Sequence, residues 1–269
     1  MKPKINYVIA AWSGPRRGKP RPTRQYEKYF KDRTYYLRFH LDWATKLKKY
    51  ISHITIVAPF NFEEEPKAFG RYLEEVSEGV GGIEVTVLRR TNIGVSFGSF
   101  SHAFRELGTD WEYYIFNEDD HIPVCQDFDA VLLGGLKKSK SGSVCAWLRT
   151  DDKYAENPVI GHPLSIAKST TLARVAKVNE GKLPYKLDPY SGLSADEFSY
   201  GFYKAGYKIT DMTETHCGSF AKGNGRIWWF GGVQKSPTKI PGKEALVVPI
   251  EVWENSNKKH AREITNQLI

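Results

Sequence analysis

The chain is poor in cysteine. Its 269 residues include three, Cys125, Cys145 and Cys217, and no two of them form a CxxC pair. An odd number of cysteines without such a pair favours a reducing, intracellular setting.

Long hydrophobic runs are also missing. No stretch approaches the ~18–20 apolar residues that a membrane span needs. The first residues, 1–4, lead directly into a strand-like segment, without the apolar region and cleavage site of a signal peptide. We therefore expect a cytoplasmic protein with no transmembrane segment, for which contact with a membrane surface stays open.

Several catalytic signatures are absent as well. The sequence contains no GxSxG, Walker A or HExxH element, which excludes several classes of hydrolase and NTPase. What is present is ordinary globular usage, with 41% hydrophobic and 26% charged residues. A chain of this length buries a sizeable core without disulfides or structural metals.

The charge is unbalanced towards the basic side, with a formal net charge of +8. This excess fits nucleotide phosphates, an anionic acceptor glycan or a membrane surface as partners. No nucleic-acid recognition motif is present, so nucleic acid is not expected. Much of the excess lies in 15–24, where five basic residues alternate with prolines; this composition predicts a mobile basic loop.

The first half of the chain alternates strand-like and helix-like patterns. Short apolar or β-branched runs predict strands, and apolar residues at helical spacing predict helices. In chain order we expect strand 5–11, helix 34–51, strand 54–58 ending at Pro59, helix 66–78, strand 83–88, a helix around 97–107 and strand 113–116. This order predicts an α/β fold with a mostly parallel sheet and helices on both faces.

The second half is less regular. We expect a helix at 131–138, strands at 143–148 and 160–167, helices at 170–177 and 196–205, and a strand at 207–211. Beyond Gly223 the sequence is rich in Gly, Trp and Pro and ends in a charged, helical segment, 252–269. We predict a single domain, 1–225, and a C-terminal extension, 226–269, that packs on the domain or trails from it.

Three consecutive carboxylates, Glu118, Asp119 and Asp120, follow the strand 113–116. Ligands of parallel α/β sheets bind outside the carboxyl ends of the strands. Adjacent carboxylates repel one another, and a divalent cation such as Mg²⁺ or Mn²⁺ relieves this while sharing its shell with substrate phosphates. The alternative is a solvated acidic turn that caps the next helix, with His121 as a hydrogen-bonding surface group.

A second acidic pair, Asp196 and Glu197, opens the helix 196–205. Ser194 and Glu197 fit a capping box, and Asp196 suits the positive end of the helix dipole, which is a complete structural account. The functional alternative is that one carboxylate acts as a general base towards an acceptor hydroxyl. The two interpretations are compatible.

In this order the motifs resemble those of the GT-A glycosyltransferases, especially the inverting, family 2-like members. Glu118-Asp119-Asp120 resembles their DXD-type metal motif, which favours Asp120 as the direct metal ligand, helped by Asp119 or Glu118. Ala195-Asp196-Glu197 resembles the xED motif that ends in the catalytic base, but its two acids are in reverse order. Either Asp196 or Glu197 can therefore be the base, and Asp196 is favoured. His216 resembles the late histidine that completes the metal shell in many members.

The resemblance also suggests a nucleotide site. Asn92-Ile93-Gly94 resembles an N-x-G segment that leads into a helix lining the nucleotide pocket, and Ser99 lies in that helix. Ala11 and Trp12 follow the first strand, where a nucleotide base often sits in this fold, and Asp119 of the acidic cluster is counted with the donor-binding residues. The implied cofactors are Mn²⁺ or Mg²⁺, and the implied donor is a nucleoside-diphosphate sugar, UDP-sugar favoured over GDP-sugar.

The function implied is inverting transfer of a sugar to a glycan or another hydroxyl acceptor. Two alternatives stay open. A sugar nucleotidyltransferase also combines an α/β sheet with carboxylate-bound Mg²⁺. A non-catalytic glycan- or nucleotide-binding protein on the same fold is the second, since fold does not fix function.

Overall fold

The computed structural model describes residues 2–13, 32–60, 66–149, 156–160, 164–179, 193–212, 216–217 and 244–250. The basic segment 15–24 and the helix expected at 252–269 lie outside these ranges. None of the helices in the described ranges combines the length and the apolar character of a membrane-crossing segment.

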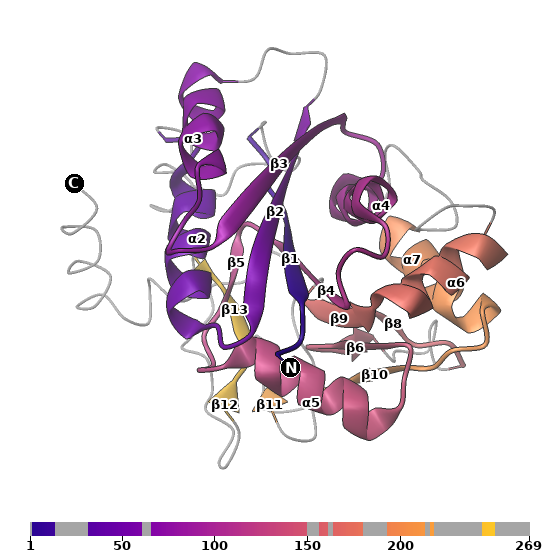
Figure 1. Cartoon of the computed structure of the whole chain (residues 1–269). Coiled ribbons are helices and arrows are strands. Elements are labelled where there is room, and N and C mark those ends of the chain that lie inside the picture. The colour runs from indigo at the N-terminus through magenta and orange to yellow at the C-terminus, as the bar shows by residue number, and fades with distance from the viewer. Residues whose placement is uncertain are drawn as a thin grey trace, which may run out of the picture.

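A seven-stranded sheet forms the centre of the molecule (Figure 1). Its order is β10-β6-β9-β4-β1-β2-β3, and β9 is antiparallel to both of its neighbours while the other pairs are parallel. The strands are β1 (Ile5–Ala10), β2 (Ile51–Phe60), β3 (Glu84–Thr91), β4 (Tyr113–Glu118), β6 (Ser143–Cys145), β9 (Ser165–Lys168) and β10 (Ile209–Asp211).

Helices cover both faces of this sheet, as Figure 1 shows. One face packs against α2 (Tyr35–Leu47), α3 (Lys67–Ser77) and α5 (Phe128–Ser139). The other packs against α4 (Val95–Leu107), α6 (Ser169–Val178) and α7 (Leu193–Lys204). Strand β1 shows why both faces are apolar: Tyr7 and Ile9 point into the first core and Val8 into the second, because alternate side chains of a strand face opposite sides. The predicted α/β class with a mostly parallel sheet is confirmed.

The predicted end of the first helix is wrong. Ile51 continues the apolar spacing of the helix, but α2 ends at Leu47 and Ile51 begins β2. The carboxylate of Asp129 in α5 accepts the backbone N–H groups of Lys49, Tyr50 and Ile51 at 2.9, 2.5 and 2.7 Å. These bonds keep residues 49–51 out of the helix. The sequence around these residues does not predict them, because Asp129 is distant in the chain.

Other boundaries also differ. Strand β2 runs through Pro59 instead of ending there. The expected strand 143–148 is divided into β6 and β7 (Leu148–Arg149), and the expected strand 160–167 into β8 (Val159–Ile160) and β9. Strands β7 and β8 leave the central sheet and pair with each other.

Two further pairs lie beside the sheet and involve the C-terminal part of the chain. Strand β5 (His121–Pro123) is antiparallel to β13 (Val247–Pro249), and β11 (His216–Cys217) is parallel to β12 (Glu244–Ala245). Leu246, Val247 and Ile250 are fully buried. Residues 244–250 therefore pack into the domain, directly beside the strand that follows the acidic residues.

Candidate functional site

The acidic residues lie at the carboxyl end of β4, in the middle of the sheet. Ala10 at the end of β1 pairs with Glu118 at the end of β4, so the loop after β1 and the turn after β4 are neighbours. Residues 119–120 form a tight turn between β4 and β5. This is the edge at which parallel α/β sheets bind ligands.

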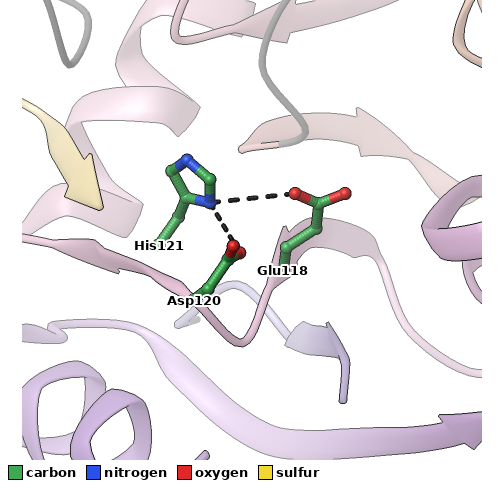
Figure 2. A group of neighbouring side chains, drawn as sticks. All are labelled: Glu118, Asp120 and His121. Carbon is green, nitrogen blue, oxygen red and sulfur yellow. Dashed lines mark hydrogen bonds and ion pairs between the residues drawn. The ribbon is translucent and has the colours of Figure 1, made fainter. Parts of the chain in front are cut away.

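Three side chains of this turn converge: Glu118, Asp120 and His121 (Figure 2). The Nδ1 atom of His121 lies 2.7 Å from Oδ1 of Asp120 and 3.7 Å from Oε2 of Glu118. One potential ligand atom from each residue lies within 4.8 Å of the others. The side chains of Glu118 and Asp120 are 21% and 20% exposed and that of His121 8%, so the group is sheltered but open to a ligand.

Two carboxylates and an imidazole are a donor set that suits Mn²⁺, because oxygen ligands dominate and a single nitrogen is added. The Nδ1 atom of His121 lies within hydrogen-bond distance of the Asp120 carboxylate. An imidazole nitrogen binds a metal in its deprotonated form, so Nδ1 of His121 would act as a ligand without a proton. The residues present therefore fit a divalent cation.

Asp119 takes a different direction from its two acidic neighbours. It is 3% exposed, its Oδ2 accepts the backbone N–H of Trp12 at 3.1 Å, and its own N–H bonds to the carbonyl of Ala10. Asp119 is not part of the converging group. It ties the loop after β1, with Ala11 and Trp12, to the turn after β4.

The histidine of the converging group is His121, a residue that the sequence-based interpretation treated as a surface group. It is only 6% exposed. Its position directly after Asp120 and three residues after Glu118 was the signal available in the sequence. His216, the predicted late ligand, lies on β11, where its N–H bonds to the carbonyl of Met212, and it is not among the three residues that converge.

The predicted nucleotide-binding turn 92–94 connects β3 to α4. Gly94 precedes the helix in a left-handed conformation, with φ of 79°, which favours glycine. The guanidinium of Arg90 stabilises the turn: it donates hydrogen bonds to Oγ of Ser99 at 3.1 Å and to the backbone carbonyls of Ile93 and Val95. Burial lowers the pKa of Arg90 to about 10.

Two polar side chains of this turn have different surroundings. Ser99 is fully buried, and its hydroxyl also bonds to the carbonyl of Val95, so it supports the turn from within. The Oδ1 atom of Asn92 is shielded from solvent and has no hydrogen-bond partner within the described ranges.

Asp196 lies in the first turn of α7 and is 5% exposed, while Glu197 is half-buried. Two positions further on, the ring of Phe198 packs on Phe116 of β4 at 6.0 Å and on Phe97 of α4 at 5.2 Å between centroids. The first turns of α4 and α7 therefore meet over the carboxyl-terminal half of β4. The side chain of Ser194, expected in a capping box, lies outside the described residues.

Comparisons with known proteins extend the fold assignment. No protein-family model matches the sequence, and no curated protein matches it. Among solved structures, a mannosyltransferase from Pyrobaculum calidifontis, in complex with GDP-mannose and Mn²⁺, superposes with a TM-score of 0.52 and 14% identity. The match covers 78% of this chain and 55% of the mannosyltransferase, so the chain spans about half the length of that protein.

Two further structures match less closely. The 4-diphosphocytidyl-2C-methyl-D-erythritol synthase from Anaerococcus prevotii has a TM-score of 0.47 and 12% identity, over 78% of this chain and 86% of that one. A protein from Bacillus anthracis described as a glucose-1-phosphate thymidylyltransferase has a TM-score of 0.44 and 11% identity, over 77% and 87%. At these identities the likeness concerns the fold, and the match to the mannosyltransferase supports the predicted GT-A fold class.

Proposed function

We propose that this protein is a metal-dependent glycosyltransferase that uses a nucleoside-diphosphate sugar as donor and transfers the sugar with inversion. The observation that carries the proposal is the convergence of Glu118, Asp120 and His121 at the carboxyl end of β4. The likeness in fold to a mannosyltransferase whose structure holds GDP-mannose and Mn²⁺ supports it.

In this proposal Glu118, Asp120 and His121 hold the divalent cation. When bound, the cation supplies positive charge to the donor diphosphate and so stabilises it as a leaving group. His216 stays a sequence-based prediction for a further ligand.

The nucleoside is assigned to the loop after β1 and the turn before α4. Asp119 holds the backbone of Trp12 in place. Asn92 is half-buried and its Oδ1 is shielded from solvent, so contact with the nucleoside requires a rotation of its side chain. Gly94 brings the backbone N–H groups of the helix start within reach of a phosphate or ribose, which helix N-termini favour. Ser99 and Arg90 fix the shape of the turn rather than contact the donor.

Asp196 is assigned as the general base that takes the proton of the acceptor hydroxyl. Its burial at a helix N-terminus restricts its motion and its contact with water, as a positioned base requires. Glu197 is more exposed and is the alternative base. The acceptor class is a glycan or another hydroxyl compound.

Calorimetric titration tests the metal site. Wild-type protein is titrated with Mn²⁺, and then with GDP and UDP in the presence of Mn²⁺ or of EDTA. Asp120→Ala and His121→Ala each remove one ligand, so each is expected to weaken Mn²⁺ binding by more than the ~10–100-fold that the loss of an outer-sphere partner costs. Asp42→Asn is the control, because Asp42 makes an ion pair with Lys46 on α2.

Wild-type Mn²⁺ affinity in both ligand variants would overturn the site. Nucleotide binding that is equal with Mn²⁺ and with EDTA would exclude a metal-dependent donor. Asp196→Asn is expected to keep donor binding and to lose transfer. Release of pyrophosphate from a nucleoside triphosphate and a sugar phosphate would instead identify a sugar nucleotidyltransferase.

A further inference from the structure

A chain of buried polar groups lies under the acidic turn. Tyr7 of β1, His40 of α2 and Asn117 of β4 are all fully buried. The hydroxyl of Tyr7 lies 2.7 Å from Nε2 of His40, and Nδ2 of Asn117 lies 2.9 Å from the Tyr7 hydroxyl. The same Nδ2 lies 2.9 Å from the backbone carbonyl of His121.

The direction of the two Asn117 hydrogen bonds follows from the groups involved. The carbonyl of His121 only accepts, so the amide nitrogen of Asn117 faces it and donates both of its protons, one to His121 and one to Tyr7. The Tyr7 hydroxyl and Nε2 of His40 form the remaining bond, whose direction depends on the tautomer of the imidazole. Burial lowers the pKa of His40 to about 3, which favours the neutral imidazole.

This chain acts on the backbone of the turn that carries the converging side chains. Asn117 precedes Glu118, and its amide closes the turn onto the carbonyl of His121. The N–H of Asp119 bonds to the carbonyl of Ala10, and the carbonyl of Asp120 accepts the N–H of Ile250. These bonds hold the turn against β1 and the C-terminal segment, and the Asn117 bond joins its two ends.

We propose that Asn117, supported by Tyr7 and His40, is the positioning unit that holds Glu118, Asp120 and His121 in their converging arrangement. Asn117 and Tyr7 are not in the converging group and act through the backbone of the turn. The inference rests on the proposed function for the identity of the bound cation, whereas the closure of the turn is a property of the metal-free protein.

Two variants test the unit. Tyr7→Phe removes one oxygen and leaves an N–H of Asn117 and Nε2 of His40 without their partner. Asn117→Ala removes the closing bond itself. The control is Thr55→Val, which also deletes a buried hydroxyl: Thr55 donates to Asn6 at 3.0 Å, and Asn6 points to the opposite face of β1 from Tyr7.

Each protein is measured in two ways. Mn²⁺ affinity is taken by titration, and amide hydrogen exchange is followed across residues 118–124 without metal. We expect the two variants to bind Mn²⁺ about 10–100-fold more weakly than wild type. We also expect them to exchange faster in the turn, while Thr55→Val changes neither property there.

Wild-type affinity and wild-type exchange in both variants would overturn the inference, as would equal effects in Thr55→Val. If the wild-type protein binds no Mn²⁺, the proposed function fails. The exchange data then still decide whether Asn117 and Tyr7 position the turn.

Discussion

At the scale of single residues, His40 makes the free energy of unfolding depend on pH. Burial lowers its pKa from 6.5 to about 3, and the carbonyls of Asp119 and Glu118, with the charge of Asp120, only partly oppose this. In the unfolded chain the imidazole takes up a proton near its ordinary pKa, whereas in the folded protein it does not. The folded state therefore loses stability as the pH falls below about 6.5.

Replacing His40 by glutamine should remove this dependence. Glutamine retains an acceptor for the Tyr7 hydroxyl but does not take up a proton. Between about pH 7.5 and about pH 5.5, His40 is expected to account for about 1.4 kcal/mol of the decrease in the free energy of unfolding. Urea unfolding of both proteins at the two pH values measures it. Parallel decreases in wild type and His40→Gln would contradict the neutral, buried imidazole.

Single residues also show how far the sequence predicts the site. The three carboxylates were recognisable because they follow a buried strand, and the structure separates them by direction: Glu118 and Asp120 converge, and Asp119 turns to Trp12. The burial of His121 was not visible, because it depends on packing in three dimensions. His121 is beside Asp120 in sequence, but its side chain is buried only when segments distant in sequence pack around it.

At the scale of elements, the junction between β3 and α4 depends on a close approach at Gly98. A Cβ atom on Gly98 would lie 1.9 Å from the carbonyl oxygen of Ile93 and 2.7 Å from Nη2 of Arg90. The carbonyl is backbone and cannot move without moving the turn. The absence of a side chain at Gly98 is therefore what lets the turn lie against the helix.

Gly98→Ala is expected to destabilise the protein by on the order of 3 kcal/mol, because it overpacks a rigid contact. Gly134→Ala is the matched control, since Gly134 is an exposed residue within α5 and nothing lies within 4 Å of its added Cβ. The control should gain about 0.5–1 kcal/mol through the better helix propensity of alanine. Chemical denaturation measures both, and a neutral Gly98→Ala variant would contradict the packing described.

Helices and strands were predictable where the spacing of apolar residues within one segment determined them. Strand β1 and helices α3 and α4 lie where apolar spacing placed them. Two features were not predictable: Ile51 fits the helical spacing, but Asp129, 78 residues away, holds it in the sheet, and β9 enters the sheet antiparallel between β4 and β6. Both depend on partners distant in sequence, which a pattern in one segment does not specify.

At the scale of the whole molecule, the candidate site depends on a segment far along the chain. Within the described ranges, the strand partner of β5 is β13, and flanking bonds from Ile250 N–H to the Asp120 carbonyl and from Val124 N–H to the Leu246 carbonyl extend the pairing. Ile250 packs with Tyr36 and Phe39 of α2 and with Ile122. Residues 244–250 thus fix the backbone on which Asp120 and His121 lie.

This dependence predicts that metal binding and the docking of residues 244–250 are coupled. Ile250→Ala leaves a cavity beside β5, which typically costs about 2–5 kcal/mol. It should also weaken Mn²⁺ binding, since the segment that holds Asp120 is loosened. Val178→Ala is the control, because Val178 is 38% exposed on α6 and makes no part of this contact.

Coupling between two sites is reciprocal, so Mn²⁺ should in turn slow the amide exchange of residues 246–250 in the wild-type protein. The decisive measurements are the Mn²⁺ affinity of Ile250→Ala and the exchange of that segment with and without metal. Two results together would show that the segment only packs on the domain. The Ile250→Ala variant would lose stability but keep wild-type Mn²⁺ affinity, and the amide exchange of residues 246–250 in the wild-type protein would be the same with and without Mn²⁺. Weaker binding and metal-dependent protection together would show that residues 244–250 belong to the site.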